Sequence, residues 1–303
     1  MLGLGAPVSP SYALEPRFQA AKARVRVSQL FQLGLGLAEF YIKPLGEREA
    51  RAWMNSQGPY TPRMRRWIGH HRNDFDYFLC FSYRYWTTYH ALQQVRGKGI
   101  LVPTAEPDPA VEMPMFRDNF REVRAIMYNS HEERDMIEAH ANNHEVANVV
   151  VGVGIVDPPP VNAERFRVER SIEGPFLLYV GRIDANKGCE QLFDYYRRAH
   201  ALMTAAAESP PQLVLAGSAI LDIPEHPGIT YLGQVSEQEK YDALSACTAL
   251  VMPSFYESLS MVLLEAWALS RPVLVNAHCD VLKGQARRAD GGLWYGEIGR
   301  AHV

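Results

Sequence analysis

Short apolar runs alternate with longer stretches of helical composition from residue 75 onward. In the first half of the chain we predict strands at residues 77–82, 99–103, 125–129 and 146–152. Helices are predicted between them, at residues 87–94, 115–120 and 132–141. A regular alternation of strand and helix is typical of α/β proteins with a doubly wound parallel sheet.

The same alternation returns after residue 175. Apolar runs that predict strands lie at residues 176–180 and 248–252. Helices are predicted at residues 240–246 and 259–269, the latter mostly buried. The proline run Asp157-Pro-Pro-Pro160 separates the two regions. We therefore expect a domain over residues 1–156, an interdomain connection over 157–174 and a second domain over 175–296.

Two helix starts carry the capping-box pattern, a serine followed three positions later by a glutamate. These are Ser130 with Glu133 and Ser236 with Glu239. The first fifty residues are less clear. Gly3-Leu-Gly5 precedes a proline instead of a helix, which argues against a phosphate-binding loop, and residues 24–28 suit an early strand.

Composition narrows the class of protein. With 303 residues, 47% of them hydrophobic, the chain can bury one large core or two. A net charge of −3 argues against a nucleic-acid partner. The four cysteines form no CxxC pair, and neither a signal-peptide pattern nor a run of eighteen apolar residues occurs. We expect a cytoplasmic protein and leave peripheral membrane contact open.

The stretch from Pro253 to Ala266 carries the clearest chemistry. Glu257 lies in a polar turn after a predicted strand, and Glu265 lies about two turns into the following helix. A helix N-terminus suits a phosphate because its N–H groups lack intrahelical partners. A carboxylate can accept hydrogen bonds from two hydroxyls, which suits a sugar or a ribose.

Two glutamates separated by seven residues resemble the motif of retaining GT-B glycosyltransferases of the family 4 (group 1) kind. The stretch from Phe176 to Gly188, with its Gly-Arg and Lys-Gly pairs, resembles the same family. The resemblance extends to about Tyr295. It implies two Rossmann-like domains facing a cleft, a nucleoside-diphosphate sugar donor, a glycan or lipid-linked acceptor, and no metal or other cofactor.

The resemblance also implies roles for individual residues. Arg182 and Lys187 would hold the donor diphosphate and act in catalysis together with Glu257, which would meet the donor sugar. Glu265 would hold the ribose hydroxyls. The remaining donor-binding positions would be Gly181 and the start of the helix at Ser258, Leu259 and Ser260. Many relatives have glycine at the two serine positions, so the space for the donor is expected to be tighter here.

Candidates in the N-terminal region are less specific. His90 could face the donor sugar or simply pack, and Glu106 follows a predicted strand and could equally be a turn carboxylate. The aromatic cluster Tyr83, Tyr85, Trp86 and Tyr89 could form an acceptor platform, although we favour packing. His70 and His71 lack a third metal ligand at a suitable spacing, so no metal site is predicted.

Relative to the family pattern, about two βα units are missing upstream, and the match stops near residue 295. We interpret residues 297–303 as a non-native tail, because their codons can contain the start of a common sequencing adapter. A chain truncated at both ends is expected to be poorly soluble and inactive in sugar transfer. Two alternatives to the transferase remain: a non-catalytic remnant that binds sugar nucleotides, and a GT-B epimerase or phosphorylase.

Overall fold

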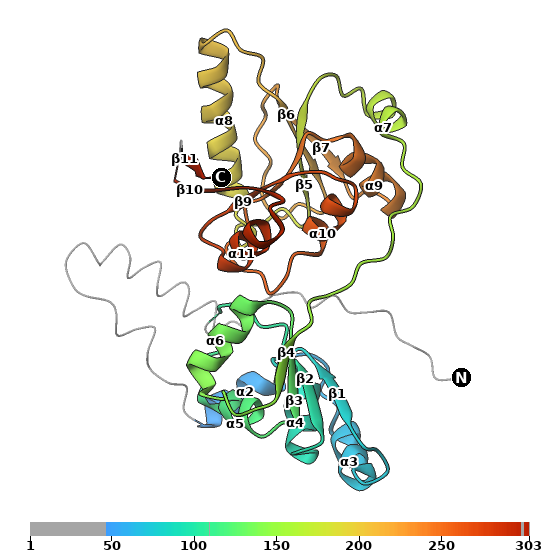
Figure 1. Ribbon diagram of the computed structural model, residues 1–303, viewed down its shortest axis with the longest axis vertical. Coiled ribbons are helices and arrows are strands. Elements are labelled where there is room, and N and C mark those ends of the chain that lie inside the picture. The colour runs from blue at the N-terminus through green and yellow to red at the C-terminus, as the bar shows by residue number, and fades with distance from the viewer. Residues whose placement is uncertain (1–46, 109, 298–299, 303) are drawn as a thin grey trace, which may run out of the picture. The chain divides into compact units, whose positions relative to one another are not determined.

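The structure is a computed structural model that describes residues 47–108, 110–297 and 300–302 (Figure 1). The glycine pair at residues 3–5 and the early strand at residues 24–28 lie outside the described residues. Two largely parallel sheets are present, and each is described by itself. The chain divides into two compact units, and the whole second sheet lies in one of them.

The first sheet has four strands in the order β1-β2-β3-β4. Their bounds are β1 Phe78–Phe81, β2 Gly99–Val102, β3 Ala125–Tyr128 and β4 Asn148–Val150. β2 pairs in parallel with β1 on one side and with β3 on the other. All four predicted strands are confirmed, each slightly shorter than its apolar run.

The described residues of this part of the chain form five helices: α2 Glu47–Asn55, α3 Pro62–His71, α4 Trp86–Gln94, α5 Pro114–Arg121 and α6 His131–Ala141. Helices α4, α5 and α6 were predicted, whereas α2 and α3 were not. Tyr83 and Trp86 are only 3% and 2% exposed, and the Tyr83 ring lies edge-on to Phe116. The preference for packing is therefore confirmed for these two rings, which belong to the core.

The second sheet has seven strands in the order β11-β10-β9-β8-β5-β6-β7. Their bounds are β5 Phe176–Val180, β6 Gln212–Ala216, β7 Ile229–Gly233, β8 Ala249–Met252, β9 Val273–Asn276, β10 Gly292–Glu297 and β11 Arg300–His302. Neighbouring strands are parallel, except that β10 and β11 are antiparallel. The two strands predicted here, β5 and β8, are confirmed. Part of the segment interpreted as a non-native tail thus forms β11, although its origin stays a prediction.

Helices flank this sheet: α7 Ala163–Arg170, α8 Cys189–Ala205, α9 Glu237–Ala246, α10 Met261–Ala268 and α11 Asp280–Ala289. Successive side chains on a strand point to opposite faces, so each face has its own core. Leu250 and Met252 belong to one buried cluster, and Val251, between them, belongs to the other. All four cysteines are free and buried, as expected of small core residues for Cys80 and Cys247.

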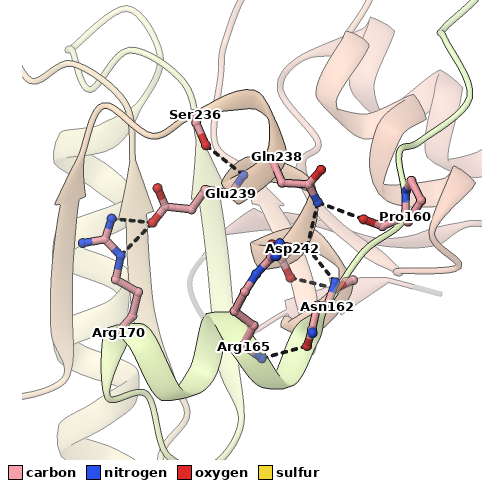
Figure 2. Close-up of polar contacts among 9 residues, drawn as sticks. Pro160, Asn162, Arg165, Arg170, Ser236, Gln238, Glu239 and Asp242 are labelled. Carbon is pink, nitrogen blue, oxygen red and sulfur yellow. Dashed lines mark hydrogen bonds and ion pairs between the residues drawn. The ribbon is translucent and has the colours of Figure 1, made fainter.

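Helix α7 lies inside the segment predicted as an interdomain connection, and it was not predicted. Figure 2 shows the polar contacts that join it to α9. The buried Asp242 carboxylate accepts hydrogen bonds from the backbone N–H of Asn162 (2.6 Å) and from Gln238 Nε2 (3.1 Å), and it forms an ion pair with Arg165. The segment therefore packs on the second sheet's helices. The predicted domain boundaries stay a prediction.

Both capping boxes start their helices as expected. Ser130 Oγ accepts from the Glu133 N–H, and Ser236 Oγ accepts from the Glu239 N–H, each at 3.1 Å. The glutamate side chains form further contacts, some local and some with distant residues. Glu133 accepts from the N–H groups of Asn129 and Ala105, both at 2.6 Å, and Glu239 pairs with Arg170. Within the described residues, no helix has both the length and the apolar character needed to cross a membrane.

Candidate functional site

The strand order of the second sheet reverses between β5 and β8. From β5 the chain continues outward to β6 and β7, and then returns to the other side of β5 with β8 and β9. In open α/β sheets, ligands bind where the order reverses, beyond the carboxyl ends of the strands. The two loops that leave β5 and β8 at this point span residues 181–188 and 253–260. They contain most of the residues predicted to bind the donor.

Glycines let the loops at this edge approach each other backbone to backbone. Gly188 has a φ of +72°, and a Cβ there would lie 2.1 Å from the carbonyl oxygen of Pro253. A Cβ at Gly217, where φ is +136°, would lie 1.9 Å from the carbonyl oxygen of Gly181. A larger residue at either position would collide with main-chain atoms and would also need a strained conformation. Glycine is thus required for these loops to meet.

Lys187 and Glu257 meet between the loops that follow β5 and β8. Lys187 Nζ lies 2.7 Å from Glu257 Oε1, although seventy residues separate them. Glu257 is buried, with 8% of the residue exposed. Burial alone would lower the pKa of Lys187, but the neighbouring Glu257 carboxylate outweighs that effect, and the pKa is raised. Lys187 therefore stays a cation, positioned by a carboxylate at the carboxyl end of the sheet.

Arg182 is oriented by Asp184, which the sequence did not suggest as a site residue. The Arg182 guanidinium forms an ion pair with the buried Asp184 carboxylate. Asp184 also accepts from the Lys187 N–H at 2.8 Å, and the Tyr179 hydroxyl donates to the Arg182 carbonyl at 2.7 Å. Asp184 thus connects both predicted cations. Its position two residues after Arg182 is the one local signal that could have identified it.

The predicted phosphate-binding helix start is α10. It begins at Met261, with Ser260 as its N-cap residue and without an acidic side chain in its first turn. The Ser260 N–H donates to Gln285 Oε1 of α11 at 3.2 Å. Buried Ser254 and Ser260 have hydroxyls that find no hydrogen-bond partner among the described residues. Ser258 and Leu259 precede the helix and are partly buried.

Glu265 lies in α10 and forms an ion pair that the sequence did not predict. Its Oε1 atom lies 2.8 Å from Nζ of Lys240 in α9, and both side chains are largely buried, at 13% and 15% exposure. Lys240 also contacts Glu237 at 2.7 Å. Glu265 is therefore held in place by α9, which was not among the predicted site elements.

The two N-terminal candidates fall in different compact units, His90 in the first and Glu106 in the second. His90 lies in α4, and its ring is 4.3 Å, centroid to centroid, from that of Trp86. Glu106 lies in the loop after β2 and is partly buried. His70 and His71 end α3, where His71 pairs with Asp74 at 2.7 Å. Among the described residues, no group of three metal-ligating side chains is present.

Part of the chain is similar to a known family. Residues 174–292 match the family model of the glycosyl transferases group 1. A curated relative, the alpha-D-kanosaminyltransferase of Streptomyces kanamyceticus, is 34% identical over 111 residues. That match covers 34% of this chain and 28% of the relative, so the chain aligns with well under two thirds of that protein's length.

Several solved structures share the fold at low identity. WaaG, a glycosyltransferase involved in lipopolysaccharide biosynthesis, superposes with a TM-score of 0.55 at 15% identity, over 77% of this chain and 68% of its own. Sucrose-phosphate synthase from Thermosynechococcus elongatus superposes with a TM-score of 0.59 at 18% identity, over 78% of this chain and 68% of its own. A UDP-forming trehalose-phosphate synthase from Burkholderia xenovorans superposes with a TM-score of 0.58 at 11% identity, over 78% of this chain and 66% of its own. The expected GT-B fold is confirmed.

Proposed function

We propose that this chain belongs to a retaining glycosyltransferase that moves a sugar from a nucleoside-diphosphate donor to a glycan or lipid-linked acceptor. The observation that carries the proposal is the Lys187–Glu257 pair, placed where the sheet order reverses and beside the start of α10. The match of residues 174–292 to the group 1 family supports it.

The leaving diphosphate gains negative charge as the glycosidic bond breaks, and preorganised cations lower the energy of that state. Lys187 and Arg182 would supply these charges, while Asp184 and Glu257 keep them in place. The N–H groups at the start of α10 would add to the positive field. The described residues thus offer the donor phosphates a site made from side-chain cations and backbone.

The two glutamates would bind hydroxyl groups. Glu257 would meet the donor sugar, its charge balanced by Lys187. Glu265 would meet the ribose, held in orientation by Lys240. His90 and Glu106 remain proposed contacts from the N-terminal region.

Donor binding by the 303-residue chain tests the proposal. UDP and GDP should each be titrated calorimetrically into the wild type, Lys187→Ala and Arg182→Ala. We expect one of the nucleotides to bind, and each variant to weaken that binding at least tenfold, because a charge-assisted hydrogen bond contributes about 1.5–3 kcal/mol. Arg287→Ala is the matched control, since it removes one cation from the exposed end of α11. Wild-type affinity in both site variants would contradict the diphosphate assignment.

A sugar-transfer assay then separates the alternatives. Labelled donor and candidate acceptors should yield a glycosylated product with a transferase, a donor with altered stereochemistry with an epimerase, and a sugar phosphate with a phosphorylase. A remnant that only binds would give none of these. In a transferring protein, Lys187→Ala should slow turnover by on the order of 10²–10³.

A further inference from the structure

A cavity lies among α2, α3 and α4, far along the sequence from the predicted diphosphate site. Its volume is about 300 Å³. Its lining includes Asn55, Tyr60, Arg65, Arg66, Trp86 and His90. We call it the arginine–aromatic pocket. Its size lies at the lower end of the range for small-molecule sites, which suits a ligand with a single sugar ring.

The charge of the lining favours an anion. Arg65 and Arg66 line the pocket, no carboxylate does, and among the described residues neither guanidinium has an ion-pair partner. Both lie near the start of α3, whose first turn contains no acidic residue. Two guanidinium groups can hold the oxygens of one phosphate through several charge-assisted hydrogen bonds.

The remaining walls are aromatic and carry a few polar atoms. The Trp86 ring lies 5.2 Å from Tyr60 and 4.3 Å from His90, centroid to centroid. Trp86 Nε1 donates to Asn55 Oδ1 at 3.1 Å, which leaves the Asn55 amide N–H groups to face a ligand. His90 Nδ1 is buried and has no hydrogen-bond partner among the described residues. Burial and the nearby Arg65 lower the pKa of His90.

We propose that the arginine–aromatic pocket binds a small phosphorylated sugar, with the phosphate on Arg65 and Arg66 and the sugar ring against the exposed Tyr60 ring. Trp86 is buried and forms the floor behind Tyr60. An exposed aromatic face suits a sugar ring because it offers apolar surface with polar groups at the edges. Asn55 and His90 then supply hydrogen bonds for sugar hydroxyls. The pocket shares His90 with the proposed donor contacts and uses none of the residues that would hold the diphosphate, so it stands or fails separately from the diphosphate assignment.

Calorimetric titration of the 303-residue chain with three probes tests it: glucose 6-phosphate, inorganic phosphate and glucose. We expect saturable binding of glucose 6-phosphate, weaker binding of phosphate, and the weakest binding of glucose. Arg65→Ala and Arg66→Ala should each raise the Kd for glucose 6-phosphate at least tenfold. The Kd of Arg66→Lys should lie between those of the wild type and Arg66→Ala, because lysine keeps the charge and loses the planar guanidinium.

Arg63→Ala is the matched control, because Arg63 is an exposed arginine of the same helix that does not line the pocket. It should leave the Kd unchanged, and melting curves should show that all four variants fold. Undetectable binding of glucose 6-phosphate to the wild type would overturn the proposal. So would equal losses in Arg63→Ala and Arg66→Ala, or phosphate binding as tightly as the sugar phosphate.

Discussion

At the scale of single residues, buried carboxylates organise both parts of the chain. Asp184 and Glu257 position the two cations of the candidate donor site. Glu133 has a comparable structural role near the first sheet, where its carboxylate accepts from the N–H groups of Ala105 and Asn129. Only 1% of Glu133 is exposed, so its protonation is coupled to folding.

Glu133 predicts a pH dependence of stability. Burial raises its pKa from 4.5 to about 7, against the opposing effect of the backbone N–H groups. Because the folded protein binds this proton more tightly, the stabilising contribution is present below about pH 4.5 and is lost as the pH rises through 7. Between pH 5 and pH 8 we expect Glu133 to lower the free energy of unfolding by on the order of 3 kcal/mol.

Urea denaturation at pH 5, 6, 7 and 8 measures this effect in the wild type and in Glu133→Gln. In Glu133→Gln, the free energy of unfolding should fall less steeply between pH 5 and pH 8, because the titrating carboxyl is gone. Glu145→Gln, at an exposed position, removes the same type of group and is the control. Identical pH profiles for the wild type and Glu133→Gln would show that Glu133 does not take up a proton in this range.

At the scale of elements, the contact of α7 with α9 shows how a chain segment that looks like a linker becomes part of a unit. Asn162 caps α7 by accepting from the Arg165 N–H at 2.8 Å. Asp242 then connects α9 to the start of α7 (Figure 2). Burial disfavours the Asp242 charge, but the hydrogen bonds from Arg165 and Asn162 outweigh it and lower the pKa.

Replacing Asp242 should therefore weaken the attachment of α7. Asp242→Ala removes the charged acceptor of the Asn162 N–H and the ion-pair partner of Arg165, and a hydrogen bond to a charged group contributes about 1.5–3 kcal/mol. Chemical denaturation should show that loss, and limited proteolysis should cut more readily between residues 157 and 171. Glu239→Ala breaks only the more exposed pair with Arg170 and should cost less than about 1 kcal/mol. Equal effects of the two variants would rule out a special role for Asp242.

At the scale of the whole molecule, the two proposed ligand sites are built from different parts of the chain. The loops that follow β5 and β8 in the second sheet contain the candidate diphosphate site. The arginine–aromatic pocket lies among helices of the N-terminal region. Each ligand should therefore stabilise its own part of the chain.

Hydrogen exchange with a saturating nucleoside diphosphate should reveal this. A ligand at a hundred times its Kd stabilises the state that binds it by about 2.7 kcal/mol. We expect slower exchange in peptides spanning residues 181–188 and 253–262, and no change in peptides from α3. Lys187→Ala should reduce the protection at the same nucleotide concentration, because a tenfold higher Kd lowers the stabilisation to about 1.4 kcal/mol. Protection confined to α3 would place the nucleotide in the wrong site for the proposed function.

Local patterns were sufficient to predict much of this protein. Apolar runs bounded by turn residues located six strands, because burying both faces of a parallel sheet leaves continuous apolar segments. Ser130 and Ser236 marked two helix starts through contacts only three residues away. Lys187 and Glu257 could be proposed from motifs, since each lies in a short segment whose spacing is itself the signal.

Contacts between distant segments were decided by the tertiary structure. The approach of Gly188 to Pro253, the pairing of Glu265 with Lys240 and the attachment of α7 through Asp242 all join residues far apart in the chain. The arginine–aromatic pocket likewise requires three helices, two of which were not predicted. Such contacts depend on strand order and helix packing, and a local alternation of apolar and polar residues contains no information about which distant segments become neighbours.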